Sequence, residues 1–195
     1  AVKPRTDEAV SAVLFQEFDA AMSAFGPFEP NPDIAVAVSG GSDSMALILL
    51  VDFWVRVRGG RVIALTVNHG LREETAFETR IVKEWMQKRR IEHKILDWNG
   101  EKPKTNLQSQ ARNARYKLID DWCRDHRILH VLVGHTANDQ AETYLMRLRR
   151  QSNLDGLAGM SAIRELVNCR LLRPLLSIKR EDLRKFLSRA GQKWL

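Results

Sequence analysis

Ile34-Ala35-Val36-Ala37-Val38-Ser39-Gly40-Gly41-Ser42-Asp43-Ser44 joins an apolar run to a turn rich in glycine and serine. The apolar residues predict a buried strand over 34–38, and the segment after the turn predicts a helix over 44–56. Glycines let the backbone approach a ligand closely, and the first N–H groups of a helix attract anions. An ordinary turn capped by Ser42 or Asp43 is the alternative. The complete S-G-G-S-D-S string between a strand and a helix favours a phosphate-binding loop.

This loop matches neither of the two common nucleotide-binding patterns. It lacks the lysine of the Walker motif and the glycine spacing of the dinucleotide fingerprint. A carboxylate at Asp43 would repel a phosphate directly, so we expect Asp43 to hold a metal ion that bridges to the phosphates. The remaining candidate phosphate ligands are Ser39, Gly40, Gly41, Ser42 and Ser44.

Length and composition limit the class of protein. The chain has 195 residues, enough for one domain with a proper core, and a formal net charge of +7. Positive charge is compatible with a polyanionic partner but is weak evidence alone. Cys123 and Cys169 are the only cysteines and are far apart, which argues against a disulfide framework, a structural zinc or an iron–sulfur cluster. No run is apolar enough for a membrane helix, and a cytoplasmic location is expected.

Hydrophobic periodicity predicts alternating strands and helices. The predicted helices are 8–24, 44–56, 73–90, 106–125, 138–150 and 178–190, and the predicted strands are 34–38, 61–67, 91–98 and 128–133. We expect a loop over 151–160, a hairpin or extended arm over 161–175, an N-cap at Ser177 and a helix stop at Gly191.

This βα alternation predicts an α/β fold, Rossmann-like, with a twisted and mostly parallel sheet and helices on both faces. In such a sheet, ligands bind at the carboxyl ends of the strands. The segments that follow three of the strands, 39–44, 68–72 and 134–139, are therefore expected to meet at one edge.

A second group of polar residues begins where the strand ending at Val133 gives way to a helix. His135 and Asp139 are four residues apart and lie on one side if helical geometry extends that far. Thr136 and Asp139 also match a capping box. The two interpretations are compatible, because a capping residue can also face a site.

Two groups of arginines have both an ordinary and a functional interpretation. Arg112 and Arg115 can form a solvated helix face or contact a ligand. Arg147, Arg149 and Arg150 can stabilise a helix C-terminus or contact nucleic-acid phosphates.

Taken together, several segments resemble the tRNA(Ile)-lysidine synthetases, a family of the N-type ATP pyrophosphatase (PP-loop) superfamily. The matching segments are Ser39–Ser44 (SGGxDS), His69–Arg72 (HGLx), Ala111–Tyr116 (ARxxRY), His135–Thr143 (HxxxDQAET), Arg150–Met160 (RGSGLxGLxGM) and Leu171–Leu176 (LxRPLL). Gln151 and Asn153 replace two of the family glycines.

The resemblance implies an adenine nucleotide alpha hydrolase-like domain that uses ATP and Mg²⁺ to join L-lysine to C2 of the wobble cytidine. The substrate would be a tRNA(Ile) with the anticodon CAU, and the reaction would pass through an adenylated cytidine. By position, Arg115, His135 and Asp139 would be catalytic, Ser39–Ser44 would hold pyrophosphate, and Asp43 would help to place Mg²⁺. The basic run Arg147, Arg149 and Arg150 is the candidate tRNA contact.

The same resemblance makes residues 1–195 an N-terminal catalytic domain without the family's C-terminal tRNA-binding domains, and it is compatible with a homodimer. Other hypotheses are a nucleotide- or RNA-binding PP-loop module without ligase activity and another PP-loop tRNA-modifying enzyme. Among the latter, 2-thiocytidine synthetases use C-x-x-C cysteines, which this sequence lacks.

Overall fold

The computed structural model describes residues 6–69, 73–98, 107–149 and 159–195. The helices are α1 (Thr6–Ala24), α2 (Ser42–Arg56), α3 (Glu73–Lys88), α4 (Leu107–His126), α5 (Ala137–Arg149) and α7 (Arg180–Arg189). The strands are β1 (Asp33–Ala37), β2 (Arg61–Asn68), β3 (Glu92–Asp97), β4 (His130–Val133), β5 (Ile163–Glu165) and β6 (Arg170–Leu172). Every element predicted from the hydrophobic periodicity is present.

The strands form one six-stranded sheet in the order β3-β2-β1-β4-β6-β5. All neighbours are parallel except β5 and β6, which form the antiparallel hairpin expected within 161–175. At the centre, Ala35 of β1 is in register with Ile63 of β2 and with Val131 of β4. The chain leaves β1 for β2 on one side and reaches β4 on the other, so a crevice opens between β1 and β4 at their carboxyl ends.

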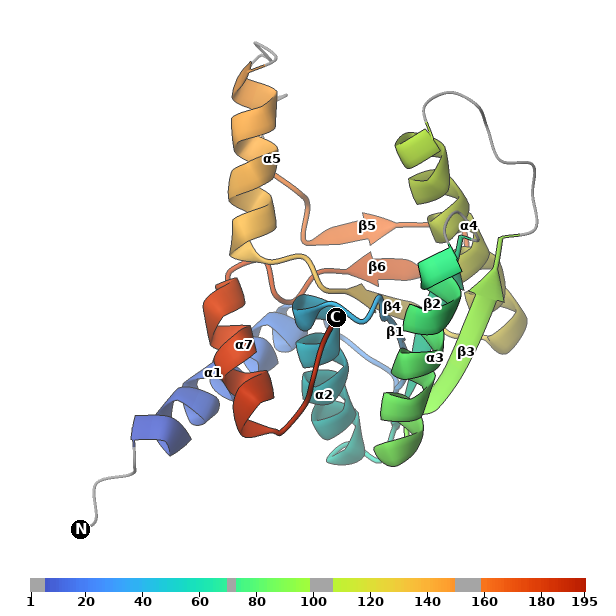
Figure 1. Ribbon diagram of the computed structural model, residues 1–195. Helices are drawn as coiled ribbons and strands as arrows, with labels where there is room; N and C mark the ends of the chain where they lie inside the picture. Colours follow the sequence, from blue (N-terminus) through green and yellow to red (C-terminus); the bar gives the residue numbers. More distant parts are fainter. Residues whose placement is uncertain (1–5, 70–72, 99–106, 150–158) are drawn as a thin grey trace.

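Alternate residues of the strands supply two separate cores. On one face, Ile34 and Val36 of β1 pack in a cluster with α1, α2, α3 and α7. On the other face, Ala35 packs with Ile119 and Cys123 of α4. The prediction of helices on both faces is therefore confirmed, although α5 contributes no buried residue and projects from the body of the domain (Figure 1).

The two predicted boundaries of the last helix had different outcomes. The expected N-cap at Ser177 is wrong: Lys179 is the N-cap, because a turn in which the Ile178 N–H donates to Leu175 O precedes the helix. Gly191 does stop the helix, with φ +61°. Its N–H donates to Ser188 O, and the next N–H donates to Leu187 O, the hydrogen-bond pair of a Schellman motif.

Cys123 and Cys169 lie together although they are far apart in the sequence. Both are buried and free. A hydrogen bond with Cys123, together with burial, raises the pKa of the Cys169 thiol. Both thiols are therefore core groups. Among the helices that the structure describes, none is both long and apolar enough to cross a membrane.

Candidate active site

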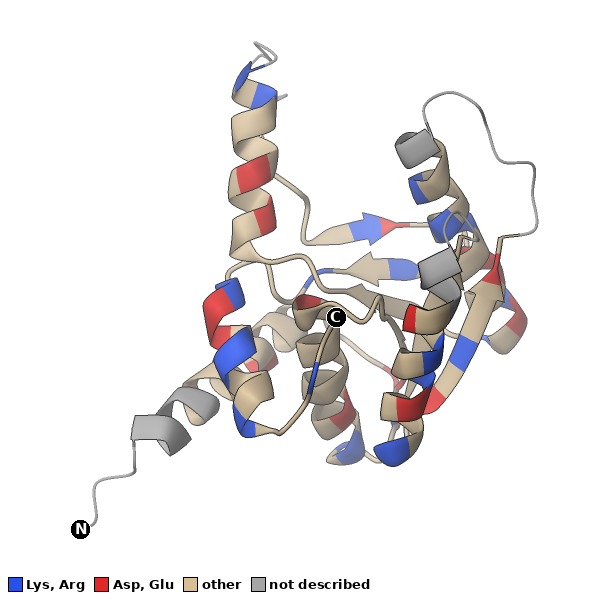
Figure 2. Ribbon diagram, in the orientation of Figure 1, with Lys and Arg blue, Asp and Glu red and all other residues tan. Residues whose placement is uncertain are grey.

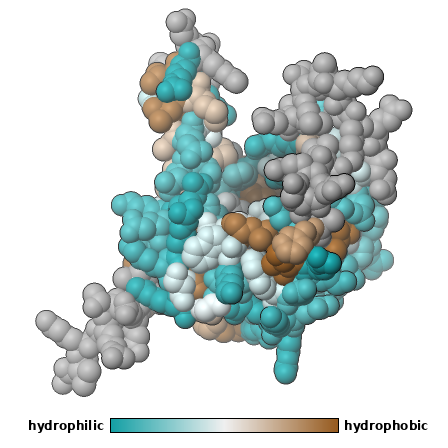
Figure 3. All heavy atoms as spheres, in the orientation of Figure 1, coloured by the Kyte–Doolittle hydropathy of each residue, from teal (hydrophilic) through white to brown (hydrophobic). Residues whose placement is uncertain are grey.

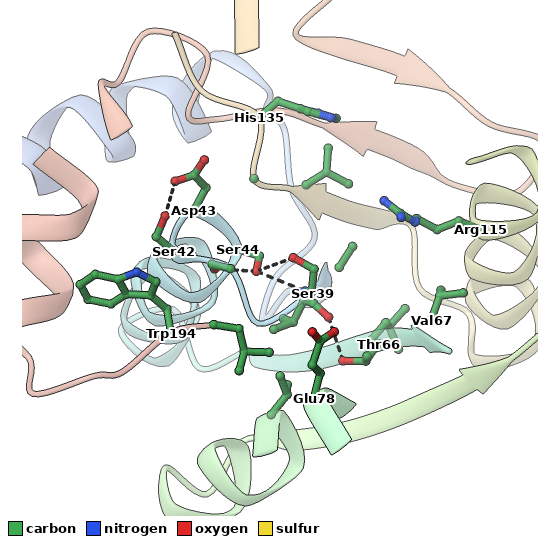
Figure 4. Close-up of a pocket in the computed structure, with 18 of the residues that line it drawn as sticks. Ser39, Ser42, Asp43, Ser44, Thr66, Val67, Glu78, Arg115, His135 and Trp194 are labelled. Carbon is green, nitrogen blue, oxygen red and sulfur yellow. Dashed lines mark hydrogen bonds between the residues drawn. The ribbon is translucent and has the colours of Figure 1, made fainter. Parts of the chain in front are cut away.

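A cavity of ≈ 570 Å³ opens at the carboxyl ends of β1, β2 and β4 (Figure 4). Its walls include the loop Ser39–Ser44, His69 after β2, Arg115 on α4, and His135 with Asp139 around the start of α5. The predicted convergence at one sheet edge is thus confirmed for the described residues. Gly70, Leu71 and Arg72 of the second loop lie outside them.

Hydrogen bonds within the loop fix the shape of its Ser39–Ser44 segment. The Ser44 hydroxyl donates to Gly41 O at 3.0 Å and accepts the Ser39 N–H at 3.2 Å. Gly40 has φ +88°, a conformation that favours glycine. Gly41 is the N-cap of α2 and carries no side chain to cap it. The first-turn N–H groups lack intrahelical acceptors, and they belong to residues that line the cavity.

Two remote segments pack closely on this loop. The Leu195 N–H donates to Gly40 O at 2.9 Å, and Trp194 beside it lines the cavity (Figure 4). Gly134, at the end of β4, touches the backbone of α2: a Cβ built there would lie 3.0 Å from Asp43 C and Ser44 N. The loop is therefore held from both sides.

Arg180, the first residue of α7, joins the two candidate catalytic segments. Its Nε donates to Asp43 Oδ2 at 2.8 Å, and its Nη2 donates to Asp139 Oδ1 at 2.9 Å. Asp43 is further fixed by the Ser42 hydroxyl at 2.9 Å. The hydrogen bond with Asp43 is the largest cause that raises the pKa of Arg180.

Asp139 also caps α5, as the capping-box interpretation predicted. Its Oδ2 accepts the Thr136 N–H at 2.7 Å and the Thr136 hydroxyl at 2.8 Å. The other carboxylate oxygen faces Arg180 and the cavity. The capping interpretation of Asp139 is therefore confirmed, and the same residue also lines the cavity.

The carboxylates of Asp43 and Asp139 fit a magnesium ion. They contact one guanidinium, so two hard oxygen donors lie on either side of one position. Within the described residues, no three histidine, cysteine, aspartate or glutamate side chains form a metal cluster. Mg²⁺ commonly binds one or two carboxylates and completes its shell with water and substrate phosphates, so two protein donors suffice.

His135 is held as a neutral hydrogen-bond donor. Its Nδ1 accepts a hydrogen bond from Nε of the buried Arg173 at 3.1 Å, so in the neutral ring the proton is on Nε2. Burial, and then the charges of Arg173 and Arg112, lower its pKa to about 4. At neutral pH this side chain can donate to an oxygen in the cavity but is a poor proton acceptor through Nε2.

A second arginine–histidine pair, Arg115 with His69, also lines the cavity. Arg115 approaches His69 Nε2 with Nε at 3.4 Å and Nη2 at 3.3 Å. Burial and the charge of Arg115 lower the pKa of His69. The ring of Trp98 packs edge-on against His69. Arg115 therefore points its charge toward the cavity from α4 (Figure 4).

Two of the three predicted tRNA contacts, Arg147 and Arg149, do not line this cavity. Arg147 and Arg149 occupy the outer end of α5, whereas its acidic residues lie nearer the base (Figure 2). Exposed apolar side chains gather at the same end (Figure 3). They are Tyr144, Leu145, Met146 and Leu148. Arg150 lies outside the described residues, as does most of the predicted loop 151–160.

Three residues of the site were not expected from the sequence: Arg173, Arg180 and Trp194. Arg173 lies in a segment with a family pattern, LxRPLL, which was the available signal. His69 was expected at this edge as part of the segment 68–72. Arg180 reaches Asp43 and Asp139, and Trp194 lines the cavity, because the fold brings α7 and the last residues beside the loop.

Comparison with known proteins gives a family and a fold. A family model described as "PP-loop domain" matches residues 13–195. The proteins named tRNA(Ile)-lysidine synthase of Orientia tsutsugamushi and Bradyrhizobium diazoefficiens are 41% and 44% identical to the chain over 89% and 87% of its length. The aligned part covers 39% and 48% of those proteins, so the chain spans less than half of either.

Solved structures with similar folds are more distant in sequence. The U34-tRNA thiolase NcsA from Methanococcus maripaludis, with its [4Fe-4S] cluster, has a TM-score of 0.82 at 17% identity, covering 96% of this chain and 66% of that one. The NMN synthetase from Francisella tularensis has a TM-score of 0.58 at 12% identity, covering 96% and 71%. Both indicate the fold alone.

Proposed function

Because this chain belongs to the PP-loop domain family, we propose that it is the catalytic part of a tRNA(Ile)-lysidine synthase. The enzyme would ligate L-lysine to C2 of the wobble cytidine in a CAU anticodon, converting ATP to AMP and pyrophosphate. The names of the relatives at 41–44% identity support this assignment. The main structural support is the single cavity that brings together the loop Ser39–Ser44, Arg115, His135 and Asp139.

In the proposed first step, the C2 oxygen of cytidine attacks the α-phosphorus of ATP and pyrophosphate leaves. The loop Ser39–Ser44 and the N-terminus of α2 suit the pyrophosphate, since both present N–H donors. Asp43 and Asp139 would hold Mg²⁺, which neutralises phosphate charge when bound. Arg115 would stabilise the negative charge that remains at the α-phosphate.

In the proposed second step, the lysine ε-amine attacks C2, and the C2–O bond breaks as AMP departs. The oxygen that leaves with AMP needs a hydrogen-bond donor. The neutral His135 offers an Nε2–H, fixed by Arg173 on the other ring nitrogen. We therefore assign His135 to oxygen stabilisation, and we do not assign it to deprotonation of lysine.

The partners belong to the same proposal. The phosphates of the tRNA would contact Arg147, Arg149 and Arg150. Arginine binds nucleic-acid phosphates through charge, independently of the base sequence. A homodimer and a cytoplasmic location are further parts of the proposal. Sedimentation of the protein tests the dimer.

The decisive experiment incubates the protein with ATP, radiolabelled L-lysine and a CAU-anticodon transcript. We expect labelled tRNA and one pyrophosphate per lysine incorporated, and no label on a transcript with uridine at the wobble position. Arg115→Ala should reduce incorporation at least tenfold, whereas Lys117→Ala, an exposed cation on the same helix, should not. Binding of ATP without pyrophosphate release would instead support a nucleotide-binding module.

A further inference from the structure

Arg180 is placed between carboxylates that come from different parts of the chain. Besides Asp43 and Asp139, its Nη1 lies 3.9 Å from Glu142 Oε1. The backbone N–H of Arg180 donates to Asn138 Oδ1 at 3.1 Å, and this hydrogen bond anchors the start of α7 on α5. The guanidinium thus contacts acids of both candidate catalytic segments.

The contacts with Asp43 and Asp139 are partly shielded from solvent, whereas the Glu142 side chain is 65% exposed. The side chains of Arg180, Asp43 and Asp139 are 29%, 15% and 24% exposed. Charges in such a setting interact more strongly than fully exposed surface pairs. Three carboxylates in one region repel one another, so a cation is needed there when no ligand supplies one.

We propose that Arg180 is a positioning residue that occupies the cation position between Asp43 and Asp139 in the nucleotide-free protein. Its guanidinium then competes with a divalent cation for these carboxylates. The inference rests on the proposed function only in assigning the metal to Asp43 and Asp139. It follows that the metal binds weakly by itself and enters with the nucleotide, whose phosphates add ligands and give Arg180 an alternative anionic partner.

The test measures metal binding rather than activity. Mn²⁺ is titrated into nucleotide-free protein and the free ion is followed by electron paramagnetic resonance. Arg180→Met should bind Mn²⁺ about tenfold more tightly than the wild type, the effect of one lost competing ion pair. Lys179→Met, which removes an equal charge from the adjacent N-cap residue, should leave the affinity within about twofold.

Two further variants make the result decisive. Arg180→Gln should behave like Arg180→Met, and either folded variant answers the question if the other does not fold. Arg180→Lys keeps a cation and should remain near the wild-type affinity. Circular dichroism melting identifies the folded variants.

Unchanged or weaker Mn²⁺ binding in folded Arg180→Met would overturn the proposal, and so would an equal increase in Lys179→Met. Weaker ATP binding in EDTA, together with unchanged Mn²⁺ affinity, would show that Arg180 is instead a phosphate ligand. None of these results depends on lysine incorporation. Failure of this inference is therefore distinguishable from failure of the ligase proposal.

Discussion

Gly134 controls how closely β4 approaches the first turn of α2, and replacing it by alanine tests that contact. A Cβ at this position would meet three backbone atoms: Asp43 C and Ser44 N at 3.0 Å, and Asp43 O at 3.1 Å. Backbone cannot rotate away as a side chain can, so the strand or the loop must shift by a few tenths of an ångström. The φ angle of Gly134 is not in the left-handed region, so the expected effect is steric.

The expected cost follows from overpacking. Inserting one methyl group into a closely packed site costs about 1–3 kcal/mol, and the reduced entropy of the unfolded alanine chain offsets about 0.4–1 kcal/mol of this. We expect Gly134→Ala to lower the free energy of unfolding by about 1–2 kcal/mol. In a domain of this size that lowers Tm by about 2–8 °C.

Thermal and urea unfolding provide the measurement, and Gly41→Ala provides the matched control. A Cβ at Gly41 would meet only Ser39 Oγ, at 3.6 Å, and its φ of −69° suits alanine. The lower entropy of the unfolded chain and the poorer N-cap oppose each other, so the net change should be within about 0.5 kcal/mol.

Gly134→Ala should also weaken ATP binding in calorimetry, because Asp43 and Ser44 move with the displaced backbone. The reasoning would be refuted by an unchanged Tm and an unchanged ATP affinity. An equal loss of stability in Gly41→Ala would refute it too, since the open position would then be as sensitive as the crowded one.

Other predictions concern the β5–β6 turn and the buried imidazole of the site. Asp120→Ala should lower the free energy of unfolding in urea by about 2–3 kcal/mol, because the Asp120 carboxylate accepts hydrogen bonds from the backbone N–H of Asn168 at 3.0 Å and from its side-chain amide at 2.8 Å. The neighbouring Asp121 forms exposed ion pairs, so Asp121→Ala should lower it by less than about 1 kcal/mol. His135 has a lowered pKa in the folded state, so its contribution to stability is complete above about pH 6.5 and is lost as the pH falls through about 4; the wild type should lose stability over that range more steeply than His135→Gln. Arg173→Met should raise the pKa of His135 in an NMR titration but leave it below 6.5, because burial is the larger cause; an unchanged pKa would contradict the pairing.

Local sequence determined the elements and the gathering of the site. The run from Ile34 to Ser44 contains its own strand, turn and helix start, so the loop could be located without tertiary information. His135 and Asp139 followed because parallel strands end at a common edge. Their hydrogen-bond partners could not be foreseen, because Arg173 reaches His135 from just after β6 and Arg180 reaches Asp139 from α7.

The incorrect N-cap at Ser177 has the same origin. Serine is a good cap in isolation, but the turn from Leu175 to Ile178 is held in place because the Ala137 N–H donates to Ile178 O at 3.0 Å. A contact with α5 thus delays the helix beyond the residue that local preference selects. Ser44 illustrates a related limit: its hydroxyl donates to Gly41 O within the loop, a contact that the sequence did not predict.

The projecting helix α5 has a mechanical consequence. It has 13 residues, so its outer end lies about 20 Å from its base. Hydrogen bonds formed by Ala137, Asp139 and Gln140 hold its base on the rest of the described domain. A tilt of about 5° about this base would move the outer end by about 2 Å but would move Asp139, in the first turn, far less. The distant tip can therefore follow a bound partner while the first turn keeps its contact with Arg180.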